Sequence, residues 1–198
     1  MQKKTNLYID GTNLFAGQNE LFGPKKHISF KFLLTEMNKL IKIDEIYFYA
    51  SYMNRKNHLT PGLKDLIAAE ALFYREVIRT KHVTFYKGHR SPTSGKEKGV
   101  DVHLSVDIVK DIFLNECSQI VIMTGDADLI YPLEVVKLLK IPTLAVFLPN
   151  RFSLEMAYKV DKAFVLNFSD RFKTDRKLPK QLKVVPIKKP RMVNIRGR

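Results

Sequence analysis

The segment that decides the fold is Asn6-Leu-Tyr-Ile-Asp10-Gly-Thr-Asn13, an apolar run that ends in a carboxylate and a glycine. The run predicts a short buried strand, and the glycine lets the chain turn sharply into a helix that begins near Leu14. An aspartate before a glycine is also common in turns and at helix N-termini. Asp10 alone therefore has a structural interpretation as well as a functional one.

The chain outward from this segment alternates between strand and helix. Residue patterns predict further strands at residues 45–51, 82–86, 119–124, 143–148 and 163–166, and helices at residues 30–40, 61–79, 100–115, 129–139 and 154–158. Strands that are joined by helices pair in parallel, with helices on both faces of the sheet. The expected fold class is α/β, a three-layer α/β/α sandwich around a mostly parallel central sheet.

Length and composition restrict the class of protein. The chain has 198 residues, of which 45% are hydrophobic and 27% charged, and this is typical of one globular domain. No apolar run approaches the ~18 residues of a membrane span, and Asp10 comes too early for a secretory leader. We therefore expect a cytoplasmic protein that binds no membrane. The single Cys117 excludes an internal disulfide and a zinc site built from cysteines.

The net charge of +14 is concentrated near the C-terminus. Residues 171–198 hold 11 basic residues and one acid, so we divide the chain into a domain at residues 1–170 and a basic extension at residues 171–198. Such a polycation binds phosphate backbones without reading sequence. Three prolines favour an extended arm, whereas alternating apolar residues from Leu182 to Ile187 favour one added edge strand, and a solvated tail is the third interpretation. The extension residues expected to contact nucleic acid include Arg171, Lys173, Arg176 and Lys177.

Three separate segments bring carboxylates to one edge of the predicted sheet. Asp10 ends the first strand, and Asp126 and Asp128 follow the strand at residues 119–124. Asp101 lies at the start of the helix predicted at residues 100–115. Ligands of open parallel sheets bind beyond the carboxyl ends of the strands. Each aspartate alone could be a helix cap or a turn former, but their coincidence at one edge favours a site.

These four carboxylates raise one another's pKa unless a cation lies among them. Oxygen ligands without cysteine or histidine suit a hard ion, so we expect Mg²⁺ or Mn²⁺ as the cofactor. Such an ion activates water and neutralises a phosphoryl group under attack. Gly11 and Gly125 follow the two strands, and a missing Cβ there leaves room for a phosphate. The chain contains no P-loop, no dinucleotide-binding glycine motif and no serine nucleophile elbow.

Two polar residues near the carboxylates each have two interpretations. Asn13 either caps the helix that begins near Leu14 or hydrogen-bonds a water bound to the ion. Asp107 lies six residues beyond Asp101, which at ~100° per residue turns it to another side of the helix. It either lines the site from a distance or pairs with Lys110.

The loop at residues 88–99 is rich in basic residues just before Asp101. We expect this region to grip a nucleic-acid backbone through Lys87, Arg90, Lys96 and Lys98, beside His82 and His89, and Tyr86 to stack on an unpaired base. An ordinary solvated connection is the alternative. Arg55, Lys56 and His58 follow the strand at residues 45–51 and have the same two interpretations.

Three segments in this order resemble the signature of the NYN domain, in the LabA-like branch of the PIN-like nucleases. They are Tyr8-Ile-Asp-Gly-Thr-Asn-Leu14, Lys98-Gly-Val-Asp-Val102, and Thr124-Gly-Asp-Ala-Asp-Leu129 with Pro132 beyond it. The resemblance spans about Thr5 to Phe168 and implies a PIN-like, Rossmann-like sandwich that cleaves RNA with a metal ion. It implies metal-binding roles for Asp10, Asp101, Asp126 and Asp128, and supporting roles for Gly11, Asn13, Asp107, Thr124 and Gly125. Thr124 stands where serine is commoner and Leu129 where phenylalanine is commoner, and neither departure removes a carboxylate.

The function expected from these observations is that of a metal-dependent endoribonuclease. Asp10, Asn13, Asp101, Asp126 and Asp128 are its candidate catalytic residues, RNA is its partner, and the products carry a 5′-phosphate and a 3′-hydroxyl. The alternative is a nucleic-acid-binding regulator that keeps the fold without cutting. A small-molecule phosphoesterase is disfavoured because a basic extension serves no small substrate. The sequence allows a homodimer without deciding for or against it.

Overall fold

The computed structural model describes residues 4–24, 26–53, 60–91, 93, 97–168 and 182–188. Several residues expected to contact nucleic acid lie outside the described residues: Arg55, Lys56, His58, Lys96, Arg171, Lys173, Arg176 and Lys177.

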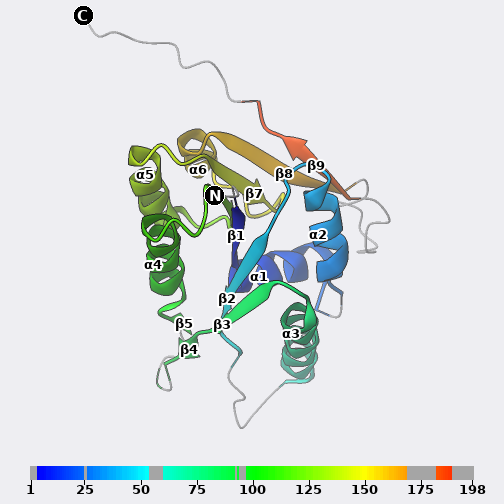
Figure 1. Ribbon diagram of the computed structural model, residues 1–198. Coiled ribbons are helices and arrows are strands. Elements are labelled where there is room, and N and C mark those ends of the chain that lie inside the picture. Colours follow the sequence, from blue (N-terminus) through cyan, green and yellow to red (C-terminus); the bar gives the residue numbers. More distant parts are fainter. Residues whose placement is uncertain are drawn as a thin grey trace, which may run out of the picture.

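A seven-stranded sheet forms the middle of the molecule, in the order β3-β2-β1-β6-β7-β8-β9 (Figure 1). Its strands are β1 (Thr5–Asp10), β2 (Glu45–Ala50), β3 (Val83–Lys87), β6 (Gln119–Met123), β7 (Thr143–Phe147), β8 (Lys162–Phe168) and β9 (Leu182–Pro186). Neighbouring strands are parallel except for β9, which pairs antiparallel with β8. The mostly parallel sheet predicted from the alternation of strands and helices is confirmed.

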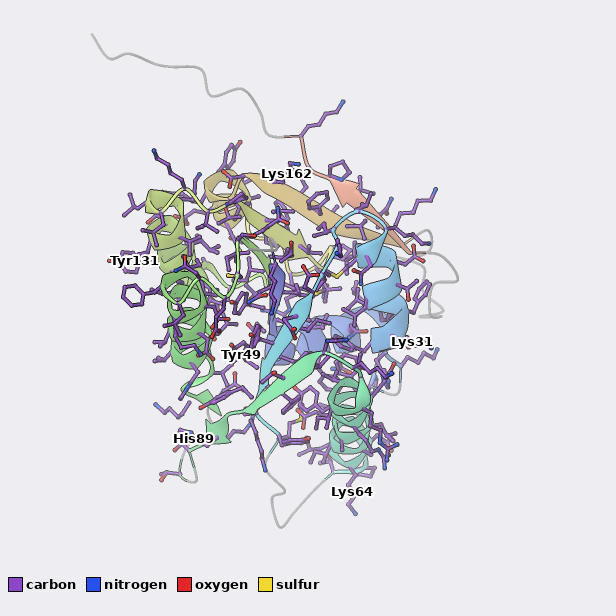
Figure 2. The ribbon with its side chains drawn as sticks, viewed as in Figure 1. Lys31, Tyr49, Lys64, His89, Tyr131 and Lys162 are labelled. Carbon is purple, nitrogen blue, oxygen red and sulfur yellow. The ribbon has the colours of Figure 1, made fainter. Side chains whose placement is uncertain are left out.

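Helices cover both faces of this sheet. They are α1 (Gly11–Phe22), α2 (Phe30–Asn38), α3 (Pro61–Arg79), α4 (Val100–Phe113), α5 (Ile130–Leu138) and α6 (Leu154–Lys159). One hydrophobic cluster joins the first three helices to the sheet, and a second cluster joins the last three helices to its other face. Lys31 on α2 and Tyr131 on α5 accordingly lie on opposite sides of the sheet (Figure 2). The expected three-layer α/β/α sandwich is therefore present.

Local sequence explains where the helices begin. The side chains of Asp10, Ser29, Thr60 and Ser153 accept hydrogen bonds from backbone N–H groups in the first turns of α1, α2, α3 and α6. These contacts satisfy amide groups that have no partner inside the helix. α4 differs, because its N-cap is Gly99 in the left-handed conformation, with φ of 78°. Glycine adopts this φ without steric cost, so the chain turns abruptly just before Asp101.

The predicted loop before α4 contains a small hairpin, and the basic extension contains a strand. Strand β4 (His89–Arg90) pairs antiparallel with β5 (Glu97–Lys98). β9 brings Val184 into the core with 9% of its surface exposed, and the Ile187 N–H donates to the carbonyl of Ala163 at 2.7 Å. The interpretation of residues 182–187 as an added edge strand is confirmed for Leu182–Pro186. Alternating side chains favour this pairing because one face of the strand reaches the core.

The strand order changes direction at β1, between the carboxyl ends of β1 and β6. The chain leaves β1 toward β2 and β3 on one side, and α4 then returns it to β6 on the other side of β1. This reversal is a topological switch point, where open α/β sheets bind their ligands. No helix among the described residues is both long and apolar enough to cross a membrane.

Candidate metal centre

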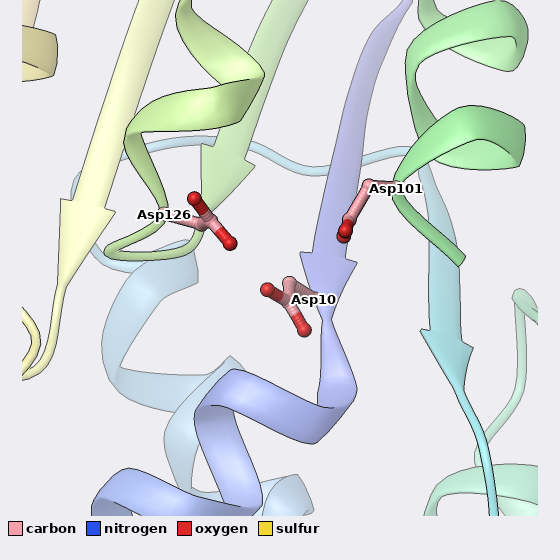
Figure 3. Close-up of side chains that lie close together, drawn as sticks. All are labelled: Asp10, Asp101 and Asp126. Carbon is pink, nitrogen blue, oxygen red and sulfur yellow. The ribbon is translucent and has the colours of Figure 1, made fainter. Parts of the chain in front are cut away.

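Asp10, Asp101 and Asp126 meet at this switch point (Figure 3). One carboxylate oxygen of each residue lies within 4.8 Å of the corresponding oxygens of the other two. The three residues come from the end of β1, the first turn of α4 and the loop after β6. Three convergent carboxylates are the donor set that a hard divalent ion prefers. The residues present thus fit the Mg²⁺ or Mn²⁺ that the sequence predicts.

Asp10 is the most deeply buried of the three, with 5% of its surface exposed. Its Oδ1 accepts a hydrogen bond from the Asn13 N–H at 2.9 Å, and its Oδ2 accepts one from the Thr124 hydroxyl at 3.0 Å. Burial raises the pKa of Asp10 to about 7, although these hydrogen bonds lower it; the charges of Asp101 and Glu97 add to the rise. The carboxyl is fixed in place but costly to ionise without a cation.

Asp101 is exposed but lies among other acids. Loss of solvation is the largest cause that raises its pKa, and repulsion from Asp126, Glu97 and Asp128 raises it further. A divalent cation among these groups reverses that repulsion, because it favours the ionised form of each carboxyl. The repulsion among these carboxyl groups therefore favours the binding of a cation.

The loop after β6 is tied to the end of β1 by side chains. The Thr124 hydroxyl, which donates to Asp10, also accepts from the Asp126 N–H at 3.0 Å. Asn13 accepts from the Gly125 N–H through its Oδ1 at 3.2 Å. The cap of α1 is Asp10, so Asn13 does not have the capping role that one interpretation gave it. Asn13 instead links the first turn of α1 to the loop that carries Asp126.

Gly11 and Gly125 lie where a side chain would clash with neighbouring protein atoms. A Cβ on Gly11 would lie 2.0 Å from Cε1 of Phe48, and a Cβ on Gly125 would lie 2.4 Å from the carbonyl oxygen of Arg151. Neither glycine has a positive φ. Close packing against Phe48 and Arg151 therefore explains them, whereas room for a phosphate, the reason expected from the sequence, stays a prediction.

Asp128 and Asp107 stand apart from the three-carboxylate group. Asp128 is exposed, and its N–H donates to Oδ1 of Asp126 at 2.9 Å, so its side chain lies beside the cluster without belonging to it. Asp107 accepts from Lys110 Nζ at 2.7 Å and from the Tyr49 hydroxyl at 2.9 Å. Pairing with Lys110, one of the two interpretations of Asp107, is the one observed.

Glu97 is a further acid that sequence reasoning missed. Its Oε2 accepts from the Thr12 hydroxyl at 2.7 Å, from the Ser51 N–H at 3.1 Å and from the Ser51 hydroxyl. The residue thereby ties the hairpin to the ends of β1 and β2, and its charge reaches Asp10 and Asp101. In the sequence it lies between two lysines and follows no predicted strand, so no motif distinguishes it.

Three of the basic residues expected to contact nucleic acid are described, and they lie in the hairpin and at the end of β3. Lys87 and Lys98 are exposed and Arg90 is half-buried. Lys87 Nζ lies 5.3 Å from the centre of the Tyr52 ring. Tyr86, expected to stack on a base, is half-buried, and its ring stacks on that of His103 at 4.2 Å between centres. His103 therefore occupies a ring face of Tyr86 that a base would need.

Comparison with known proteins supports the fold and the family. No curated protein matches the chain. The crystal structure of a protein of unknown function from Vibrio parahaemolyticus RIMD 2210633 is similar, with a TM-score of 0.59 and 13% identity over 84% of this chain and 97% of that one. At this identity, the similarity shows the fold alone. The model of the NYN domain matches residues 4–167, almost all of the described sandwich, and the chain therefore belongs to the NYN domain family.

Proposed function

We propose that this NYN domain protein is a metal-dependent endoribonuclease. The observation that carries the proposal is the convergence of Asp10, Asp101 and Asp126 within 4.8 Å at the switch point of the sheet. NYN domains generally have a PIN-like nuclease fold. Of the four acids that the sequence predicts for this chemistry, three form this group and Asp128 lies beside it. Membership of the LabA-like branch and a homodimer stay predictions.

Asp10, Asp101 and Asp126 are the residues that would hold Mg²⁺ or Mn²⁺. When bound, such an ion supplies Lewis acidity toward the phosphodiester and lowers the pKa of water. Asp10 is positioned for this by its hydrogen bonds from Asn13 and Thr124. Asp128, exposed beside Asp126, completes the ligand set or orients the attacking water. In-line attack then leaves a 5′-phosphate and a 3′-hydroxyl, with no nucleophile from the protein.

The substrate proposed is RNA, because the surroundings of the acids suit a polyanion. Lys98 ends the hairpin strand three residues before Asp101, and Lys87 ends the neighbouring β3. Both are exposed. The chain as a whole carries a net charge of +14. Positive charge on segments next to an acidic centre attracts a phosphate backbone.

The test is cleavage of end-labelled single-stranded RNA, with structured RNA and single-stranded DNA beside it, in Mn²⁺, in Mg²⁺ and in EDTA. Asp126→Asn should lower the cleavage rate at least about 100-fold, because it removes one ligand charge from the centre. Glu116→Gln is the matched control: Glu116 is an exposed acid just before β6, at the opposite edge of the sheet. This control should cut like the wild type.

Cutting by wild type and Glu116→Gln that EDTA abolishes would establish the nuclease and identify its preferred polymer and ion. Equal cutting by Asp126→Asn would contradict the assignment of the centre. If no protein cuts under any condition while all bind RNA, the nuclease proposal fails and the non-cleaving regulator replaces it.

A further inference from the structure

Three aromatic rings, of which His103 is exposed, form a stack on the flank of α4 that faces away from Asp101. The His103 imidazole stacks on the ring of Tyr86, with 4.2 Å between centres and 29° between planes. Tyr86 also contacts the ring of Tyr49, with 5.7 Å between centres. His103 is exposed, whereas Tyr86 is half-buried and Tyr49 is buried. His103 is therefore the outermost ring of a stack that is anchored in the sheet.

A second exposed imidazole lies next to this stack. A Cβ built on Gly99 would lie 3.6 Å from Cδ2 of His103 and 3.8 Å from Cε1 of His89. His89 pairs with Lys98 in the hairpin, so both imidazoles and one lysine surround the turn that opens α4. Figure 2 shows His89 on this hairpin, at the end of the molecule where α4 begins. The turn thus presents aromatic and cationic groups together.

The helix geometry relates this surface to the three carboxylates. His103 and Asp101 are two residues apart, so they point about 200° away from each other around the axis of α4. Asp101 points toward Asp126 after β6, and His103 points toward Tyr86 on β3. The separation is of the order of one helix diameter, ~10 Å, which neighbouring nucleotides of one strand can span. A nucleotide next to a phosphate at the carboxylates can therefore reach His103.

We propose that the exposed face of His103 stacks on an unpaired base next to the phosphate at the metal centre. Stacking on aromatic rings is the usual way in which proteins hold single-stranded RNA, and it tolerates any base. Tyr86 fixes the orientation of the imidazole, so little side-chain freedom is lost on binding. Lys98, which is exposed and pairs with His89 in the hairpin, lies next to this turn and can contact the backbone. This inference rests on the proposed function and extends it: the substrate is single-stranded at this position.

Binding rather than cutting tests the proposal, so that it stands or falls separately from the nuclease. In an Asp126→Asn background, we would measure the Kd of a single-stranded RNA that carries 2-aminopurine, whose fluorescence falls when it stacks. His103→Ala should raise Kd roughly five- to hundred-fold and restore fluorescence, and His103→Phe should retain both affinity and quenching. Phe113→Ala is the control: Phe113 is an exposed ring on the same helix, ~15 Å away, and its loss should change neither quantity.

A second measurement separates stacking from an effect on Tyr86. An abasic site in the RNA at the quenched position should weaken binding to the protein that keeps His103. It should leave binding to His103→Ala unchanged, because that variant has already lost the stacking contact. Circular dichroism would establish that His103→Ala is folded. Weak binding by His103→Phe equal to that of His103→Ala would overturn the stacking proposal, because the imidazole would then act through its nitrogens. An unchanged Kd in His103→Ala would overturn it as well.

Discussion

At the scale of single residues, Asp10 combines three roles that conflict electrostatically. It caps α1, it accepts a hydrogen bond from Thr124, and it faces the carboxylates of Asp101 and Asp126. The first two roles hold the side chain in a buried position. Burial without a cation raises its pKa to about 7, above the value near 3.8 that it has in an unfolded chain. Folded protein without metal therefore binds a proton that the unfolded chain releases.

This pKa predicts the stability of Asp10→Asn in EDTA. Between pH 4 and pH 7 the folded state holds the extra proton, so the contribution of Asp10 to stability falls as the pH rises through this window. Asp10→Asn removes the buried charge and should be about 2 kcal/mol more stable than wild type at pH 8, with little advantage at pH 4. Urea unfolding at the two pH values measures this difference.

Adding Mn²⁺ provides the control for this prediction. A bound cation compensates the buried charge of Asp10 in the wild type. Asp10→Asn has one carboxylate ligand fewer and binds the cation more weakly. Mn²⁺ at pH 8 should therefore stabilise wild type more than Asp10→Asn. A variant that is less stable than wild type at pH 8 in EDTA would contradict the raised pKa of Asp10.

At the scale of elements, two loops that contact α1 and each other hold Asp126 in place. The loop after β6 is hydrogen-bonded to α1 through Asn13. The loop after β7 is bound to α1 as well, where Asn150 Nδ2 donates to the carbonyl of Gly17 at 3.0 Å and Arg151 pairs with Glu20. The same Arg151 backbone packs on Gly125. The position of Asp126 thus depends on a loop that carries none of the three acids.

Gly125→Ala tests this dependence. The new Cβ would approach the Arg151 carbonyl oxygen to 2.4 Å, which is backbone and cannot move aside alone. The variant should lose about 1–3 kcal/mol of stability and, by displacing Asp126, most of its cleavage activity. Thermal unfolding and the cleavage assay measure the two effects. Gly62→Ala at the start of α3 has no atom within 4 Å of its Cβ. It should leave cleavage unchanged and should not lower stability, because alanine is the better helix former. Equal losses in the two variants would contradict the packing argument.

At the scale of the whole molecule, the basic extension contributes both charge and structure. Residues 171–198 hold 11 basic residues, but Leu182–Pro186 also form the edge strand β9. Val184 in that strand is buried in the core cluster on the α1–α3 face. A deletion of the entire extension therefore removes core packing together with charge, and the two effects need separate variants.

Two deletions distinguish charge from structure. Removal of residues 189–198 takes four basic residues and spares β9, whereas removal of residues 171–198 takes both. Both should weaken binding to long RNA and flatten its dependence on salt, the longer deletion more strongly. Only the longer deletion should lower Tm, by several degrees, because β8 loses β9, one of its two neighbouring strands. An unchanged Tm after the longer deletion would show that β9 adds no stability, and an unchanged salt dependence would assign the extension another partner.

Much of this fold and centre follows from the sequence because the signals are local. Apolar runs and helical spacing predicted every strand of the parallel sheet and α2 to α6 within a few residues, and Pro61–Arg79 coincides with α3. Parallel strands present their carboxyl ends at one edge, so Asp10, Asp101, Asp126 and Asp128 were expected to converge there. Asp10, Asp101 and Asp126 do so, because their places depend only on strand ends and one helix start.

Only the tertiary structure decided which polar residues near the three aspartates contact one another. The pairing of Asp107 with Lys110, the covering of Tyr86 by His103 and the place of Glu97 at Ser51 all depend on how distant segments pack. The same holds for β9, whose residues 182–186 pair with β8 although they lie in the extension predicted at residues 171–198. The local pattern of apolar residues determines whether a segment forms a strand or a helix, and the order of these elements indicates the fold class of the chain. Contacts between segments depend on helix phase and loop path, which no local pattern encodes.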